Sequence, residues 1–384
     1  MKRKFRIIVG MLLLAIPLCM NAQVKIAKPG QNTKEAKEEK TEQEKTEKPK
    51  DGLTMPKISG FVQGMYQANL SKDCDLLDNT LRMRRVRLSV DGNLSKTVSY
   101  KIQGDFTRSP MLVDAYVKYK PCREFAIQLG QFKTPFTLES PINPVNLEIF
   151  DYGENVQQLV GYKDVCGVGA LGRDLGLMAT GSLFPVENEN GYQYSIVDYA
   201  VGVFNGNGAN QLDNNNRKDL VGRLEVHPGL KDLTLSGSYY YGKYTKDENV
   251  NCTRNRWSAG AQYNNGKLVV RGEYFDGTTG YYNDIVNLEA NPIEQYRFSN
   301  GYYGVIGYNF KAGEQKIMPV LRYEYFEPGD MNNTVYGGTN WYTIGVNYWP
   351  LKSVNFKLDY SLVQKVIGEK TNSHRVVGIL SYKF

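Results

Sequence analysis

The feature that most constrains the fold is a two-residue alternation of apolar and polar side chains, which recurs from residue 57 to residue 384. It repeats in segments such as RRVRLSVDGNL, VSYKIQGDF, LTLSGSYYYGKY and VNFKLDYSLV. A period of two separates residue types onto the two faces of a β-strand, and strands of about 9–11 residues are typical of transmembrane barrels. Beyond the N-terminal segment, no apolar run approaches the ~20 residues that a spanning helix needs. The pattern therefore indicates a transmembrane β-barrel or a large soluble β-sandwich.

Connection lengths distinguish these two folds. Short turns alternate with longer polar junctions: the turns lie at 94–97, 120–123, 264–267, 311–315 and 350–353, and the junctions at 70–80, 133–165, 205–216, 246–253, 278–300 and 327–338. Outer-membrane barrels have short periplasmic turns and long extracellular loops, whereas a sandwich has no reason to sort its connections by length. The 28 tyrosines, many near the expected strand ends, favour the barrel because amphipathic rings form its interfacial girdles.

The strands can be counted. We expect them near 57–69, 81–94, 98–107, 111–119, 124–132, 173–183, 193–204, 217–227, 233–245, 254–264, 267–277, 301–310, 316–326, 339–349, 353–365 and 373–384. The sequence thus predicts an all-β, sixteen-stranded antiparallel transmembrane barrel over residues 53–384. The last strand has to pair with the first to remove the sheet edges. Tyr382 and Phe384 fall on its lipid face, and a terminal Phe on such a strand resembles the signal that the barrel assembly machinery recognises.

The first 52 residues have a different composition. Residues 1–22 combine a basic start, an apolar core and the cleavage-like NAQ, which is the pattern of a secretory signal peptide. A lipoprotein site at Cys19 is the alternative, but the bulky Leu18 precedes it. Residues 23–52 are dominated by Lys, Glu, Thr and Gln and lack an apolar face, so we expect a disordered periplasmic linker or a short charged helix. The location implied is the bacterial outer membrane.

The balanced charge and the small number of cysteines and histidines argue against nucleic-acid binding, metal binding and catalysis. Residues 52–384 carry 35 Lys+Arg and 33 Asp+Glu, so the basic pI of the whole chain gives no reason to expect nucleic acid. Cys74, Cys122, Cys166 and Cys252 have no CxxC spacing, and their pairing stays open. Only two histidines, His227 and His374, are present. We therefore expect no metal, no cofactor and no catalytic residues.

Specific segments resemble the phosphate-selective porin O and P family. They are LRMRRVRLSVDGNLSKTVSYKIQGDF (81–106), LVDAYVKYKP (112–121), IQLGQFKTPFTLES (127–140), GRDLGLMATG (172–181) and YAVGVFNGNG (199–208). The GQFKTPF stretch is the most specific, because alternation alone would not produce it. The resemblance implies a homotrimeric outer-membrane porin whose third extracellular loop folds inward. It also implies arginines and lysines in the pore of anion-selective members.

Alternation assigns cations to the lumen. Val86, Leu88 and Val90 mark the lipid face of one strand, so Arg85 and Arg87 project into the pore, while Arg82 and Arg84 share the lipid parity at the rim. The pore-lining or anion-binding candidates are Arg85, Arg87, Lys101, Lys118, Lys133, Arg223, Arg271, Arg322 and Arg375, with Lys133 taken from the family motif.

The third loop is acidic, which argues against a selectivity filter lined only by positive charges. It carries Glu139, Glu148, Asp151 and Glu154, together with Asp164, and only Lys163 on the basic side. A carboxylate near a permeating anion costs energy in a confined pore, so mixed charge is typical of a general diffusion pore. Alternatively, these charges pair across the wall.

The function predicted is passive diffusion of small hydrophilic solutes with a mild preference for anions. A substrate-specific receptor or adhesin using its extracellular loops, residues 278–300 in particular, is the alternative, and an outer-membrane enzyme lacks a recognisable base and nucleophile. Expected partners are outer-membrane lipid and lipopolysaccharide, the barrel assembly machinery and two further copies of the chain.

Overall fold

The computed structural model describes residues 52–71, 75–162, 164, 171–189, 191–245, 251–282, 294–329, 338–366 and 371–384. The predicted signal peptide, the charged segment up to residue 51, Cys74, Lys163 and Cys166 lie outside these residues, as do residues 283–293 of the long junction at 278–300.

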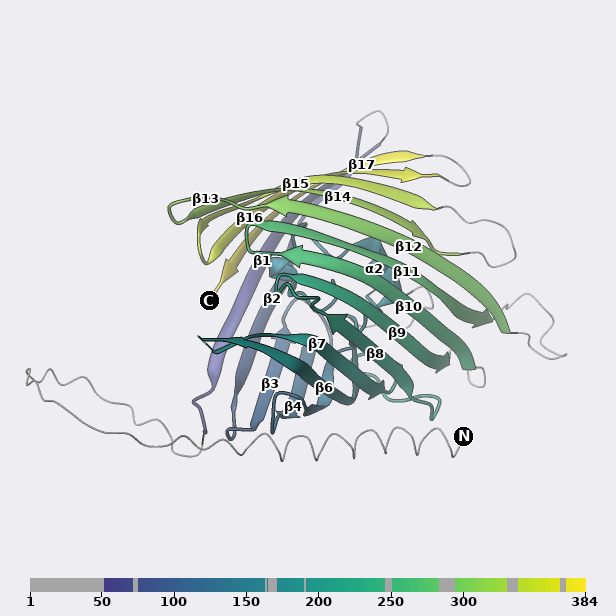
Figure 1. The fold of residues 1–384 in the computed structure, drawn as a ribbon. Coiled ribbons are helices and arrows are strands. Elements are labelled where there is room, and N and C mark those ends of the chain that lie inside the picture. Colours follow the sequence, from purple (N-terminus) through teal and green to yellow (C-terminus); the bar gives the residue numbers. More distant parts are fainter. Residues whose placement is uncertain are drawn as a thin grey trace, which may run out of the picture.

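One closed antiparallel sheet makes up the molecule, and β1 pairs with both β2 and β17 (Figure 1). Its strands are β1 (Lys57–Leu70), β2 (Leu76–Asn93), β3 (Val98–Asp105), β4 (Leu112–Tyr119), β5 (Ala126–Lys133), β6 (Arg173–Asn188), β7 (Gly191–Phe204), β8 (Asp219–Val226), β9 (Leu233–Thr245), β10 (Asn251–Asn264), β11 (Leu268–Tyr282), β12 (Glu294–Tyr308), β13 (Phe310–Ala312), β14 (Gln315–Glu327), β15 (Thr339–Leu351), β16 (Val354–Lys365) and β17 (Asn372–Lys383). Because β12 and β13 are interrupted only at Asn309 and keep one register against β14, the segments form sixteen spanning strands. The predicted sixteen-stranded barrel is confirmed.

Two short helices, η1 (Pro144–Asn146) and α2 (Glu154–Leu159), lie in the connection between β5 and β6. Across the described ranges, no helix combines the length and the apolar character that crossing a bilayer requires.

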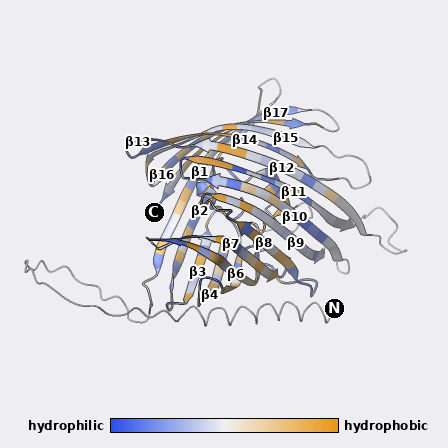
Figure 2. Cartoon of the chain, in the orientation of Figure 1, coloured by the Kyte–Doolittle hydropathy of each residue, from blue (hydrophilic) through white to orange (hydrophobic). Residues whose placement is uncertain are grey.

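The outer face of the sheet is apolar, and charged side chains such as Arg322 point inward. Along β14, Leu321 is 55% exposed, whereas its neighbours Val320 and Arg322 are 2% and 4% exposed. Orange and blue residues are interspersed along the strands of the wall (Figure 2). Apolar residues that are exposed on the outside of a closed barrel match a surrounding layer of lipid.

The seam between β1 and β17 includes the last residue. Phe384 N–H donates to Gly60 O at 3.1 Å, and Gly60 N–H donates to Phe384 O at 3.0 Å. A Cβ at Gly60 would lie 2.6 Å from the Phe384 ring, so a glycine leaves the space that this ring occupies. The Phe384 ring also stacks on Tyr382, with 6.2 Å between centroids.

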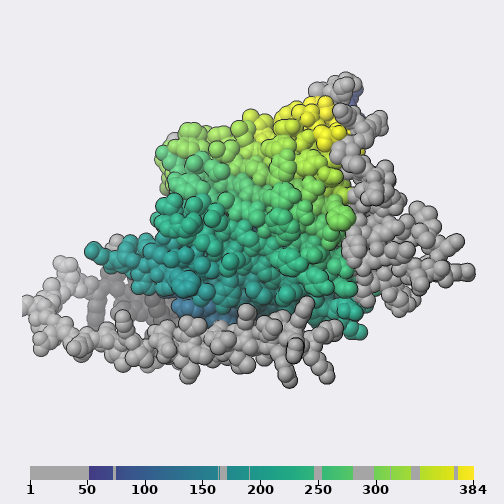
Figure 3. All heavy atoms as spheres, turned by 45° about the vertical axis from the view of Figure 1, so that its right-hand side comes forward, coloured from purple at the N-terminus to yellow at the C-terminus, as the bar shows by residue number. Residues whose placement is uncertain are grey.

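The hairpin of β6 and β7 is longer than its neighbours. Ala126, the first residue of β5, pairs with Thr180, and Val226, the last of β8, pairs with Val197. The strands continue past these positions to Asn188 and Gly191, beyond the predicted ends at 183 and 193. The resulting two-stranded ribbon projects from the rim of the barrel as the teal arm in Figure 3.

Candidate pore and its charged lining

Arg85 and Arg87 both point away from the lipid face, and both are paired. Arg85 Nη2 donates to Asp151 Oδ1 at 2.7 Å, and Arg87 Nε donates to Asp105 Oδ2 at 2.9 Å. Their exposed fractions are 6% and 4%. These guanidinium groups are therefore buried ion-pair partners on the inner face of the barrel.

A β-bulge corrects the assignment of Arg82 and Arg84. Gln63 pairs with Arg85 and Gly64 pairs with Met83, so Arg84 is an extra residue between these pairs. A bulge reverses the parity of the residues beyond it. Arg84 accordingly turns inward to an ion pair with Asp151, and Arg82 lies opposite the buried Met65. The prediction that both arginines face lipid is wrong.

The segment between β5 and β6 is bound to the inner wall by its carboxylates. Glu139 Oε2 lies 2.6 Å from Arg322 Nη1 and 3.6 Å from Arg271 Nη2. Glu148 Oε2 accepts from Arg271 Nη2 at 2.6 Å. Both carboxylate oxygens of Asp164 accept hydrogen bonds from the Arg256 guanidinium, at 2.6 and 2.8 Å. The acidic side chains of this segment thus neutralise arginines of β10, β11 and β14.

Wall carboxylates bind the same segment in the opposite sense. Glu273 accepts a hydrogen bond from the backbone N–H of Leu138 at 2.9 Å. Glu324 accepts one from that of Asn155, and Asp359 one from that of Phe150, both at 2.7 Å. A buried N–H needs such an acceptor. These bonds fix the path of the backbone against β11, β14 and β16.

An apolar cluster inside the barrel adds to this attachment. The segment contributes Phe136, Leu147, Ile149, Val156 and Leu159, and the wall contributes residues that include Tyr240, Phe275, Tyr303, Val305 and Val320. All of these side chains are less than 9% exposed. The segment is therefore packed against the inner face of the wall, and the wall residues named here lie on β9, β11, β12 and β14.

Burial and charge affect the acidic groups of the segment in opposite directions. Burial raises the pKa of Asp151, but the adjacent Arg85 and Arg84 guanidinium groups outweigh it and lower the pKa below its ordinary value. Burial likewise raises the pKa of Glu148, whereas Arg271 lowers it, with a net lowering. Both side chains stay ionised at neutral pH, so their charges cancel those of their arginine partners.

Lys133 has a different role from the other cations. Its Nζ donates to Ile142 O at 3.0 Å and to Tyr152 Oη at 2.8 Å, and also to Ser140 O. The motif lysine thus ties together three parts of the segment that it precedes. Glu154, in contrast, accepts from Gln158 within α2 at 2.5 Å.

A cavity of about 330 Å³ lies between the segment and the inner faces of β2 to β8, and we call this space the passage. Its charged lining consists of Arg87, Lys101, Lys133, Arg173, Arg223 and Asp114. Within the described residues, Lys101 and Lys118 have no ion pair, and Arg223 bonds to Glu225 at 3.0 Å. The passage is therefore basic.

Arg375 also has no carboxylate within ion-pair distance in the described part of the chain. Its guanidinium lies 4.6 Å from the Phe150 ring centroid and 5.6 Å from that of Trp341. Such cation–π contacts hold the group without cancelling its charge.

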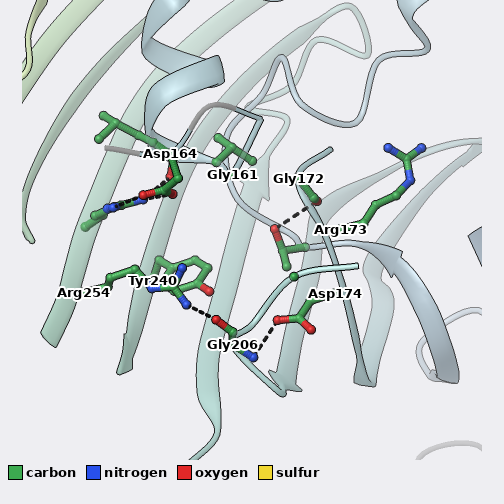
Figure 4. Close-up of a pocket in the computed structure, with 13 residues that line it drawn as sticks. Gly161, Asp164, Gly172, Arg173, Asp174, Gly206, Tyr240 and Arg254 are labelled. Atoms are coloured by element: carbon green, nitrogen blue, oxygen red, sulfur yellow. Dashed lines mark hydrogen bonds and ion pairs between the residues drawn. The ribbon is translucent and has the colours of Figure 1, made fainter. Parts of the chain in front are cut away.

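Besides Arg82 and Arg84, three further lumenal arginines were not among the candidates from the sequence. Arg173 pairs with Asp114 at 2.7 Å, and Arg256 pairs with Asp164 as described above. Arg254 donates to Gly206 O beside Tyr240, as Figure 4 shows around a small cavity, and it also donates to Asp219. The spacing of two residues between Arg254 and Arg256 repeats that of Arg85 and Arg87, and could have identified this pair.

His227, which directly follows β8, contacts the carboxylate of Asp198. Its Nε2 lies 3.0 Å from Asp198 Oδ2, and its Nδ1 lies 3.1 Å from Leu233 O and 3.2 Å from Thr234 Oγ1. Arg223 already neutralises the neighbouring Glu225. The histidine therefore links β7, the end of β8 and the first residues of β9.

Comparison with known families identifies the barrel. The model of the phosphate-selective porin O and P family matches residues 57–384. The chain belongs to this family. It is accordingly an outer-membrane porin, and its barrel lies in the bacterial outer membrane.

Solved porins share the fold at low sequence identity. The anion-selective porin from Comamonas acidovorans superposes with a TM-score of 0.61 at 12% identity, covering 86% of this chain and 99% of that one. OmpF of Salmonella typhi gives a TM-score of 0.61 at 13% identity, with 86% and 97% covered. The trimer form of OmpT from Vibrio cholerae gives 0.54 at 12%, with 86% and 100% covered. Comparison with curated protein sequences yields no match.

Proposed function

We propose that this porin passes small hydrophilic solutes with a mild preference for anions, through the passage between the β5–β6 connection and strands β2 to β8. The observation that carries the proposal is that acidic side chains of the connection are ion-paired, whereas two lysines of the wall are not. The acidic side chains Glu139, Glu148 and Asp151 are matched by wall arginines. Among the residues that the structure describes, Lys101, which lines the passage, and Lys118, which lines an adjoining cavity, have no carboxylate within ion-pair distance.

This distribution revises the role of the acidic third loop. Glu139 and Glu148 pair with Arg322 and Arg271 of β14 and β11, and Asp151 pairs with arginines of β2. Because each charge is matched in this way, these carboxylates contribute little net field in the passage. A cation beside a confined, partly dehydrated path lowers the energy of an anion there and raises that of a cation. The preference stays mild, because Arg87, Arg173 and Arg223 share their charge with Asp105, Asp114 and Glu225.

The attached connection is also proposed to set the width of the pore, as the inward-folding third loop that the family resemblance implies. Its bonds to β11, β14 and β16 support this role, because they hold it inside the circumference of the sheet. A homotrimer is proposed from the same resemblance, and the trimer form of the OmpT neighbour supports it. Lipopolysaccharide and the barrel assembly machinery are the proposed membrane partners.

The zero-current potential in a potassium chloride gradient tests the proposal. Wild-type channels in planar bilayers should show anion preference, and the double substitution K101M/K118M should reduce it. Lys352, exposed in the turn between β15 and β16, provides the control K352M, which should leave the potential unchanged. Cation preference in the wild type, or equal effects of the variant and the control, would contradict the proposal.

A further inference from the structure

One side of the passage carries an apolar surface that passive diffusion of ions does not require. Tyr116 of β4 and Met178 of β6 line the cavity, together with the exposed Pro141 of the β5–β6 connection. Tyr116 and Met178 are half-buried, and both pack against the apolar cluster of the lumen. Their remaining surface faces the cavity. We call Tyr116, Met178 and Pro141 the apolar ledge.

The register of the wall places cations directly beside this ledge. Tyr116 lies opposite Lys101 across the β3–β4 pair. Met178 lies opposite Gln128, which in turn lies opposite Lys118. Side chains of directly opposite residues are about 4.5–5.5 Å apart at Cβ. A charged group and an apolar surface are thus within the reach of one small molecule.

Packing keeps the ledge in place. The Tyr116 ring meets the Phe132 ring edge-on with 5.9 Å between centroids, and Phe132 meets Phe204 at 5.6 Å. Gly130, opposite Tyr116, has φ +136°, and a Cβ there would lie 2.9 Å from the Tyr116 Cβ. The backbone can therefore approach the tyrosine closely, and the ring has fixed neighbours on two sides.

An inorganic anion is stabilised only by the cations of the passage, because it has no apolar surface that could leave water against the apolar ledge. An organic anion gains from both, since its charged end approaches Lys101 while its hydrocarbon part leaves water against Tyr116 and Met178. A methylene group that is half removed from water contributes about a twofold gain in partition. The volume of about 330 Å³ accommodates a small molecule of this kind.

We propose that the solutes favoured by this porin are small organic anions with an apolar part, such as aliphatic or aromatic monocarboxylates. The inference rests on the proposed function and refines it. The two attractions act in one place, and each is weak enough for release, as conduction requires.

Bi-ionic potentials provide the test. Chloride on one side of a planar bilayer is exchanged for acetate, butyrate or benzoate on the other, and relative permeabilities are calculated. For the wild type, the benzoate-to-acetate permeability ratio should exceed the ratio of their aqueous diffusion coefficients at least twofold. M178Q, which keeps the length of the side chain, and Y116Q should each lower the ratio about twofold while the potential in a potassium chloride gradient stays unchanged. Met111 is 54% exposed and outside the cavity, so M111Q is a matched control that should leave the ratio unchanged.

A wild-type ratio equal to that of free diffusion would overturn the inference, as would equal ratios for the M178Q, Y116Q and M111Q channels. Failure of the proposed function gives a different result: the potassium chloride gradient itself then shows no anion preference. Both readouts come from the same channel, so the two failures are distinguishable.

Discussion

Glu139 holds the β5–β6 connection against the wall at the point where two arginines converge. The side chain is fully buried, lies between Arg322 and Arg271, and also accepts the backbone N–H of Gly153 at 2.8 Å. Replacing it by glutamine keeps the volume and an acceptor for Gly153, but removes the charge. We expect the connection to detach part of the time and the pore to widen.

The magnitude follows from the partners that remain. Breaking a buried ion pair costs about 3–5 kcal/mol. Arg322 keeps Glu324 at 3.3 Å and Arg271 keeps Glu148 at 2.6 Å, so the loss lies at the lower end, about 3 kcal/mol. That energy corresponds to about a hundredfold change in the ratio of attached to detached connection.

Single-channel recording measures this change. E139Q should show transient steps above the wild-type conductance and an increased open-channel noise. Glu154, half-buried and bonded to Gln158 within α2, supplies the control E154Q, which should conduct as the wild type does. A single level with wild-type conductance and noise in E139Q would refute the conclusion that this ion pair fixes the pore width.

Three further predictions concern assembly and charge. Deleting Phe384 removes its two backbone bonds to Gly60, and should reduce the amount of heat-modifiable barrel in the outer membrane; normal levels would contradict this. A chain lacking residues 25–51 should still fold and conduct, because that segment has no apolar face, and loss of folding or of trimers on native gels would show a structural role. Replacing Arg85 and Arg87 by glutamine should move the zero-current potential toward cation preference and, because both are buried, lower the temperature at which the barrel unfolds in detergent. The shift is expected because the substitutions leave Asp151 and Asp105 without these partners, and an unchanged potential would contradict it.

Local alternation was sufficient to predict the barrel and most strand positions, because the lipid and the lumen impose opposite polarity on adjacent residues. It failed at Arg82 and Arg84, since a bulge shifts parity without leaving a mark in the residue types. It also could not match Glu139 with Arg322, or Asp164 with Arg256. These partners are separated by 183 and 92 residues, and their contact depends on the path of an irregular segment.

The seam between β1 and β17 has a consequence for the rate of folding. It pairs Phe61 with Lys383, whereas most other neighbouring strands are joined by a single turn or loop. Closing a chain of this length costs about 5 kcal/mol of entropy, and contacts of large sequence separation form slowly. Until the seam forms, the first and last strands each present an edge of unpaired N–H and C=O groups that lipid cannot satisfy. The rate of pore formation is therefore expected to depend on how these two edges are held until they meet.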